Sequence, residues 1–182
     1  MNLPNTRQNP FEPSVQRLIE RLGLEAHDEG GYFRQIHQSE WMCETPDRPG
    51  GTRYGINTIY YLMTADSPVG HLHRNRSDII HFFHAGSPIA YYTVSPDGQL
   101  QRAVLGPDPD QGHVFQMTVP GGYWKTSVLE QGAFGLLSEA VAPGFDYRDR
   151  ELATPDEIQR LFPRLWPQLE AFTLTHPKES HD

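Results

Sequence analysis

The sequence predicts an all-β fold, because short apolar runs alternate with turn-forming residues along most of the chain. The 182 residues include 16 Gly and 16 Pro, and proline removes an amide donor and breaks helices. Valine, isoleucine, leucine and aromatic residues recur over the whole length, in runs typical of strands. A chain of this length fits one domain with a continuous core. We therefore expect a single β-rich domain over residues 1–182.

Nine strands are expected, each a short apolar or β-branched run bounded by Gly, Pro, Asp or Ser. They are the segments 32–38, 54–64, 69–73, 79–84, 88–94, 100–105, 113–119, 123–130 and 133–141. Turn sequences lie between several of them, at 85–88, 95–98 and 130–132. Short strands with tight turns are typical of a sandwich or barrel, which protects the sheet edges. The barrel core is expected over about residues 27–150.

Short helices are expected on both sides of this core. Apolar residues at helical spacing, followed by Gly23 as a left-handed cap, predict a helix over about 14–23. The capping residues Thr154, Pro155 and Glu157 predict a second helix over about 155–162.

The charge and the cysteine content limit the kinds of partner and of metal site that we expect. The formal net charge is −8 and no Lys/Arg run is present, which argues against a nucleic-acid partner. Cys43 is the only cysteine, which excludes an internal disulfide and a thiolate zinc cluster. We find no apolar run long enough for a membrane span and no secretion signal. We expect a cytoplasmic protein with a small-molecule ligand and with no nucleic-acid or membrane partner.

Four of the nine histidines lie in one strand-turn-strand unit, at positions 71, 73, 81 and 84. Side chains two residues apart on a strand share a face, so His71 and His73 are expected to point the same way and His84 away from His81. If the two strands pair with their inward faces matched, His71, His73 and His81 converge. Two or three imidazoles with an oxygen ligand suit one divalent transition metal, either Fe, Mn, Ni, Cu or Zn. The alternative is a polar pocket without a metal.

The histidine unit resembles the first motif of the cupins. It reads GHLHR at 70–74 and SDIIHFFHAG at 77–86, and VPGGYW at 119–124 resembles the second motif. The stretches HDEGGYFR at 27–34 and VAPGFDY at 141–147 resemble hallmarks of the small cupin-5 family, which is similar in fold to sugar-nucleotide epimerases. The resemblance covers roughly residues 18–153. It implies a cupin jelly-roll β-barrel, or double-stranded β-helix, with a small-molecule pocket.

Two positions depart from the pattern of metal-binding cupins. The usual glutamate ligand falls at Ile79, and the usual histidine of the second motif falls at Lys125. A charged Lys125 in the pocket would repel a divalent ion. A metal site therefore requires His81 to supply the missing ligand.

Without a metal, the same residues resemble the site of metal-free sugar-nucleotide epimerases, where a histidine removes a proton next to a carbonyl and a tyrosine returns one. This resemblance makes His73 the expected base. Side chains that could return the proton are Tyr61, Tyr123, Tyr32 and Glu139. Lys125 or Arg74 would bind an anionic group of the substrate. The full set of expected substrate-binding residues is His71, Arg74, His81, Lys125, Tyr32 and Trp124.

Three functions stay open at this point. The first is an isomerase or epimerase acting on a sugar-like or carboxylated metabolite. The second is a metal-dependent dioxygenase or lyase using His71, His73 and His81, and the third is a binding protein without catalysis, since cupins include all of these. Cupins generally pair through edge strands, so the resemblance also implies a homodimer.

Overall fold

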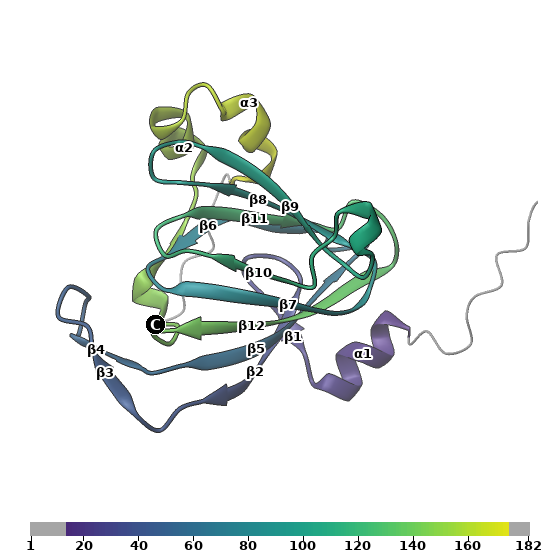
Figure 1. Ribbon diagram of the computed structural model, residues 1–182, viewed down its shortest axis with the longest axis horizontal. Helices are drawn as coiled ribbons and strands as arrows, with labels where there is room; N and C mark the ends of the chain where they lie inside the picture. Colours follow the sequence, from purple (N-terminus) through teal and green to yellow (C-terminus); the bar gives the residue numbers. More distant parts are fainter. Residues whose placement is uncertain (1–13, 175–182) are drawn as a thin grey trace, which may run out of the picture.

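Two antiparallel sheets face each other in this computed structural model, which describes residues 14–174. The first sheet has the order β1-β2-β5-β12-β7-β10 and the second has the order β13-β6-β11-β8-β9. The strands of the first sheet are Glu25–Ala26, Tyr32–Gln38, Asn57–Thr64, Phe134–Ala142, Asp78–Gly86 and Gln116–Val119 in that order. Those of the second are Arg150–Leu152, Val69–Asn75, Trp124–Val128, Ile89–Val94 and Leu100–Leu105. Figure 1 shows the second sheet stacked above the first.

A small hairpin of β3 (Met42–Glu44) and β4 (Thr52–Tyr54) extends from one end of the barrel (Figure 1). The sequence predicted one strand over 54–64, but this strand is interrupted at residues 55 and 56, between β4 and β5. At the interruption, Gly55 N donates to Trp41 O at 3.0 Å and Ile56 N donates to Ser39 Oγ at 3.2 Å, so these two residues bond to the segment between β2 and β3. Strands β1, β3 and β13 were also not predicted, because runs of two or three residues carry no periodic signal.

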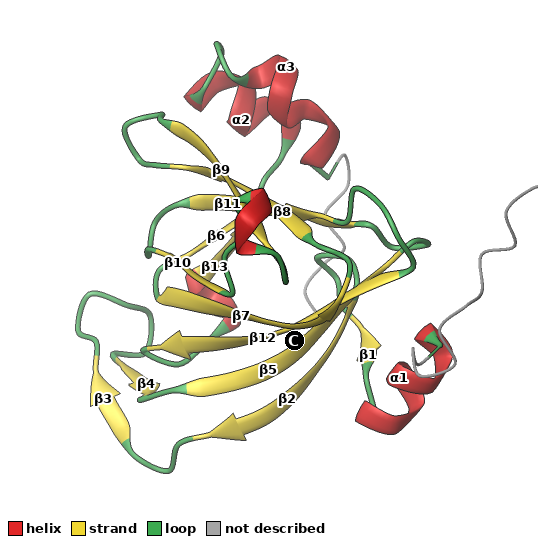
Figure 2. Ribbon diagram, turned by 45° about the vertical axis from the view of Figure 1, so that its right-hand side comes forward, coloured by secondary structure: helices red, strands yellow, loops and turns green. Residues whose placement is uncertain are grey.

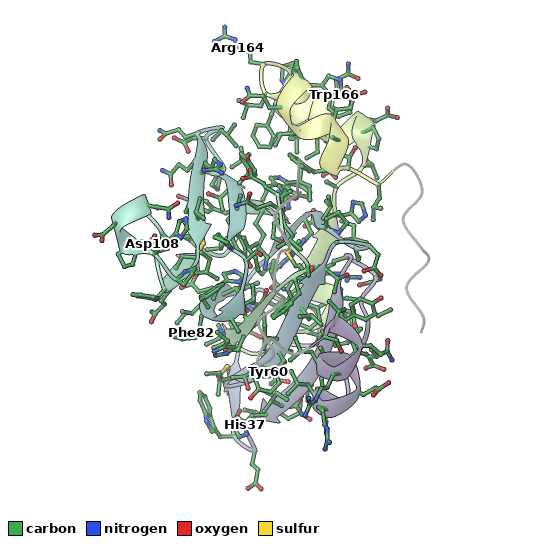
Figure 3. All side chains as sticks on the ribbon, turned by 90° about the vertical axis from the view of Figure 1, so that its right-hand side faces the viewer. His37, Tyr60, Phe82, Asp108, Arg164 and Trp166 are labelled. Carbon is green, nitrogen blue, oxygen red and sulfur yellow. The ribbon has the colours of Figure 1, made fainter. Side chains whose placement is uncertain are left out.

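Short helices cover the outer faces of the two sheets (Figure 2). Helix α1 (Val15–Leu22) begins after the N-cap Ser14, ends at Gly23 with φ of 61°, and packs near Leu62 on the first sheet. Helices α2 (Pro155–Leu161) and α3 (Trp166–Leu169) are followed by the 3-10 turn η3 (Glu170–Phe172). These C-terminal elements pack on the outer face of the second sheet. In Figure 3 they lie, with Trp166, at the opposite end of the molecule from His37 on β2. Within residues 14–174, no helix is long and apolar enough to span a membrane.

The space between the sheets is apolar at one end and polar at the other. The apolar end is filled by a cluster that includes Met63, Ile89, Leu105 and Leu137. Burial of such side chains is the main favourable term in folding. Towards the other end the inward positions of β6, β11 and β12 carry ionisable side chains, and there the packing opens into a cavity.

Candidate functional site

A cavity of about 100 Å³ lies between the sheets at the polar end of the barrel. By a comparable measure one water molecule needs about 10–15 Å³, so a small metabolite fits. Polar and apolar side chains both line it, from strands of the two sheets and from the segment after β12. They are His27, Glu29, Phe33, Gln35, Asn57, Ile59, Tyr61, His73, Asn75, Ile79, Lys125, Glu139, Val141, Phe145 and Tyr147.

His73 reaches the cavity, but His71 does not, because β6 carries a β-bulge opposite β11. Lys125 pairs with His73, whereas Ser127 pairs with Gly70, so one extra residue of β6 is inserted between them. A bulge interrupts the alternation of side chains along a strand. The prediction that His71 and His73 share a face is therefore wrong. His71 lies outside the cavity lining, next to η3, where its ring meets the backbone of Phe172.

His73 and Glu29 form a close pair in the cavity wall. Nδ1 of His73 lies 2.7 Å from the carbonyl oxygen of His71, which can only accept, so Nδ1 carries the proton. Nε2 then faces Glu29 Oε2 at 3.3 Å. Burial lowers the pKa of His73 to about 4, against the opposing effect of Glu29, so the ring is neutral at pH 7. Two hydrogen-bond acceptors therefore point into the same space.

A tight turn places Glu29 in the cavity. Gly30 and Gly31 have φ values of 102° and 70°, which favour glycine, and Gly30 N donates to His27 O at 3.1 Å. The turn is fixed to β6 by a hydrogen bond of 2.6 Å from His71 N to Glu29 O. The bulge residue His71 thus positions the pair through its backbone rather than its ring.

Arg150 holds the outer oxygen of Glu29. Its Nη1 atom lies 3.1 Å from Glu29 Oε1, and its two terminal nitrogens each donate to Asp28 at 2.7 Å. Burial would raise the pKa of Glu29, but a protonated His73, together with His27, Lys125 and Arg150, outweighs burial and lowers it. While the ring of His73 is neutral, His27, Lys125 and Arg150 are the groups that favour the charged carboxylate. Glu29 is therefore ionised beside the neutral ring of His73.

Replacing Gly30 by Ala is expected to destabilise this turn. The added Cβ would lie 2.1 Å from the carbonyl oxygen of Val69, at a φ of +102° that L residues rarely adopt. Such backbone strain costs about 1–3 kcal/mol. The matched control is Gly112→Ala, which also has a positive φ (+79°) but has no atom within 4 Å of its Cβ. Thermal unfolding should show a larger loss for Gly30→Ala, and equal losses would contradict the close contact.

Lys125 and Glu139 line the cavity and form a second polar group together with the buried His81. Lys125 Nζ lies 3.6 Å from Glu139 Oε1 and 3.5 Å from His81 Nε2. Burial would raise the pKa of Glu139, but Lys125 and His81 outweigh it and hold it well below its usual range. The carboxylate is ionised, so it is not the acid that the sequence suggested. It acts as the counterion of Lys125.

His81 is fully buried, with 0% exposure, and points inward as predicted. Its Nδ1 atom lies 3.1 Å from the ionised Glu139 Oε1 and 3.2 Å from the hydroxyl of Tyr91. Burial lowers its pKa, and Lys125 lowers it further. A neutral ring with its proton on Nδ1 satisfies this geometry, with the ammonium group of Lys125 donating to Nε2. His81 positions Lys125 and does not itself line the cavity.

The protonation of His73 can be measured without a substrate. We expect its imidazole resonances to titrate with a midpoint near pH 4, because burial lowers the pKa to about 4. Glu29 and Glu139 oppose this shift, and Lys125 adds to it. At pH 7, proton–nitrogen NMR spectra should show a neutral ring protonated at Nδ1. A midpoint at or above 6.5, the ordinary value, would contradict the described environment.

Four other predicted site residues lie away from the cavity. Arg74 stacks on Trp124 at 4.7 Å on the outer face of the second sheet, and it pairs with Glu151. Trp124 is buried there beneath the C-terminal helices. Tyr32 packs near α1 on the outside of the first sheet, and Tyr123 lies beside a minor hollow near Val119. The prediction that Arg74, Trp124 and Tyr32 contact a ligand is not supported, because they point outward from their strands, where outward residues alternate with inward ones. Tyr123 precedes β11 by one residue and does not line the cavity.

Tyr61 does line the cavity. Its hydroxyl donates to Gly30 O at 2.8 Å, and burial raises its pKa. It stays protonated at neutral pH, so it supports the glycine turn and offers its oxygen to a ligand.

The predicted metal ligands do not come together. His71 is turned away by the bulge, and both ring nitrogens of His81 already have partners. Ile79 and Lys125 occupy the positions of the remaining ligands, and both line the cavity. His27, Asp28 and Glu29 are close enough to one another to hold an ion, but Asp28 and Glu29 are already bound by Arg150. The residues present do not fit a cupin metal, and we derive no step through one.

The sequence did not assign roles to several residues of the cavity. Glu29 and His27 belong to the quoted stretch at 27–34, and its two glycines were the signal that the chain turns there. Asn75 follows His73 on the inward face of β6, beyond the bulge. Tyr147, which is 55% exposed, lines the cavity after β12.

Comparison with known proteins identifies the scaffold. A family described as Cupin_5, Cupin superfamily (DUF985), matches residues 16–153. The chain is 40% identical to Uncharacterized protein YML079W of Saccharomyces cerevisiae over 161 residues, which is 81% of this chain and 80% of the yeast protein.

The fold also occurs among solved structures. A hypothetical protein from Leishmania major has a TM-score of 0.83 and 31% identity, covering 88% of this chain and 99% of its own. Oxalate decarboxylase from Bacillus subtilis has a TM-score of 0.50 and 12% identity, covering 84% of this chain and 37% of its own. The second likeness concerns the fold alone. Together with the two facing sheets, these matches confirm the predicted cupin barrel with short helices.

Proposed function

The chain belongs to the Cupin_5 family of the cupin superfamily, and on this scaffold we propose a metal-free isomerase or epimerase that moves a proton at a carbon next to a carbonyl group. The observation that carries the proposal is the contact of 3.3 Å between neutral His73 and ionised Glu29 at the cavity wall. A cupin scaffold alone does not select a reaction, so the site must do so.

The pair is suited to accept one proton. When His73 Nε2 takes a proton from the substrate carbon, the ring becomes cationic beside the carboxylate of Glu29. Two facing acceptors then become a charge-assisted hydrogen bond, which is about twice as strong as a neutral one. The hydrogen bond from Nδ1 to His71 O keeps Nε2 aimed at the substrate. His73 is therefore the base, and Glu29 stabilises its protonated form.

Lys125 is suited to stabilise the negative charge that develops on the carbonyl oxygen. It pairs with His73 across β6 and β11, so both side chains face the cavity from neighbouring strands. Its ammonium group is held by Glu139 and His81, and a fixed donor of this kind is an efficient way to stabilise an oxyanion. The proton returns from protonated His73, either to the same carbon or to its neighbour across the former carbonyl, which leaves the ring neutral again.

Proton exchange with solvent tests this function. The protein is incubated in D2O with small carbonyl compounds. Dihydroxyacetone, erythrulose and ribulose are uncharged, whereas pyruvate and 2-oxoglutarate are carboxylates. We expect deuterium to enter the carbon next to the carbonyl of at least one of them, faster than in buffer, as measured by NMR. Compounds that bind and shift the cavity resonances without exchange would instead favour a binding protein.

A second copy of the chain is the expected partner, and the free edge of β2 supports this proposal. Strand β1 pairs only with Tyr32 and Phe33, so in the described part of the chain β2 has no outer neighbour from Arg34 onward. Ile36 on this edge is 49% exposed and nearby Trp41 is 61% exposed. Unpaired edges that carry apolar residues pair readily with another chain. Light scattering at micromolar concentration should give the mass of a dimer, and the mass of a monomer would overturn it.

A further inference from the structure

We propose that the substrate of this cavity is an uncharged hydroxy-carbonyl compound, rather than a carboxylate or a phosphate ester. The inference rests on the proposed function and deepens it, because it names the charge class of the substrate at the same site.

The cationic groups at the cavity already lie beside carboxylates, as far as residues 14–174 are concerned. Lys125 is 3.6 Å from Glu139, and Arg150 binds both oxygens of Asp28 at 2.7 Å. His27, whose ring lines the wall, lies 3.1 Å from Asp28. Two carboxylates, Glu29 and Glu139, line the cavity against the one ammonium group of Lys125. An added anion would therefore meet like charge and find no unmatched cation.

The polar groups of the cavity that can still form hydrogen bonds are suited to the hydroxyl groups of a ligand. His73 Nε2 and Glu29 Oε2 both accept, lie 3.3 Å apart, and can share the hydrogen of one hydroxyl group. The amide groups of Gln35 and Asn75 line the same cavity and can both donate and accept. Lys125 offers its remaining ammonium hydrogen to a carbonyl oxygen, which carries no net charge until the proton is removed.

The volume of the cavity and the apolar side chains in its wall indicate a substrate with a short carbon chain. Phe33, Ile59 and Phe145 line the cavity and suit the C–H surface of such a compound. The cavity of about 100 Å³ corresponds to roughly seven to ten water-sized groups. Erythrulose, an uncharged four-carbon ketose, is of this size, and erythronate is a carboxylate of nearly the same size.

Binding of these two compounds tests the inference. Each is titrated into the wild-type protein at pH 7 while the imidazole resonances of His73 are followed by NMR. We expect erythrulose to bind at least about tenfold more tightly than erythronate, which is about 1.4 kcal/mol. Equal affinity, tighter binding of erythronate, or no change of the His73 resonances with either compound would overturn the proposal that the substrate is uncharged.

Removing a carboxylate of the cavity tests whether repulsion between charges causes the preference for erythrulose. Glu139→Gln frees Lys125, so the preference for erythrulose should shrink by at least about threefold. If that variant does not fold, Glu29→Gln serves instead, because it removes the other carboxylate that lines the cavity and should strengthen the binding of erythronate relative to erythrulose. A preference that changes in neither experiment overturns the electrostatic argument.

The two proposals fail in different ways. Deuterium exchange of erythrulose is followed in the same samples. Tight binding of erythrulose without exchange would overturn the proton-transfer function and leave the charge class standing. Exchange of a carboxylate in preference to erythrulose would overturn the charge class and leave the function standing.

Discussion

Replacing Asp149 by Asn is expected to lower the free energy of unfolding by about 3–5 kcal/mol, the cost of removing one partner of a buried ion pair. Arg53 on β4 is 2% exposed and donates to the two oxygens of Asp149 at 2.8 and 2.7 Å. Arg48 adds a further contact at 3.2 Å. Without the carboxylate, buried Arg53 keeps, of its carboxylate contacts, only the longer one of 3.9 Å with Asp146 Oδ2, and half-buried Arg48 loses its ion pair. Urea unfolding measures the effect.

The control is Glu130→Gln, which breaks an exposed ion pair with Arg102. Exposed pairs contribute about 0–1 kcal/mol, so this variant should unfold almost as the wild type does. If Asp149→Asn costs no more than Glu130→Gln, the buried pair does not hold the β3–β4 hairpin to the barrel.

The pH dependence of the same pair has a definite sign. Burial would raise the pKa of Asp149, but the hydrogen bonds and charge of Arg53 outweigh it and lower the pKa below its usual value. A carboxyl group with a lowered pKa in the folded state stabilises the protein fully above its unfolded pKa of about 3.9. Stability should therefore fall as the pH drops through the folded-state pKa, and in Asp149→Asn this part of the loss should be absent.

Strand alternation was enough to predict most of the inward-facing residues. On β5, β7 and β12, residues two apart share a face, so Tyr61, His81 and Glu139 point between the sheets as expected. Gly and Pro residues between the apolar runs likewise located most strands, because they favour turns. Local patterns of this kind depend only on neighbouring positions in the chain.

The rest depends on contacts between distant parts of the chain. The bulge in β6 is a property of its pairing with β11, and nothing between Gly70 and His73 marks an inserted residue. The alternation rule therefore placed His71 in the site. Glu29 enters the cavity because its turn binds the backbone of that bulge. The pair of His73 and Glu29 could not be predicted from either segment alone.

Replacing His73 by Gln is expected to lower kcat/KM for proton exchange by about 100- to 10,000-fold, the usual contribution of a general base. Glutamine fills much of the space of the ring but has no nitrogen that can act as a general base. The matched control is His71→Gln, two residues away on the same strand, with a side chain outside the cavity lining. Because His71 positions the site through its backbone, this control should keep the wild-type rate.

The pH profile distinguishes loss of the base from loss of structure. In the wild type the rate should fall as the pH drops below about 4, because His73 is then protonated and cannot accept a proton. The residual rate of His73→Gln should lack this acid limb, whereas His71→Gln should retain it. If both variants lose the same fraction of activity and keep the same profile, proton abstraction does not occur at His73. The bulge would then be only a structural irregularity of β6, and the base would have to be sought elsewhere along the cavity wall.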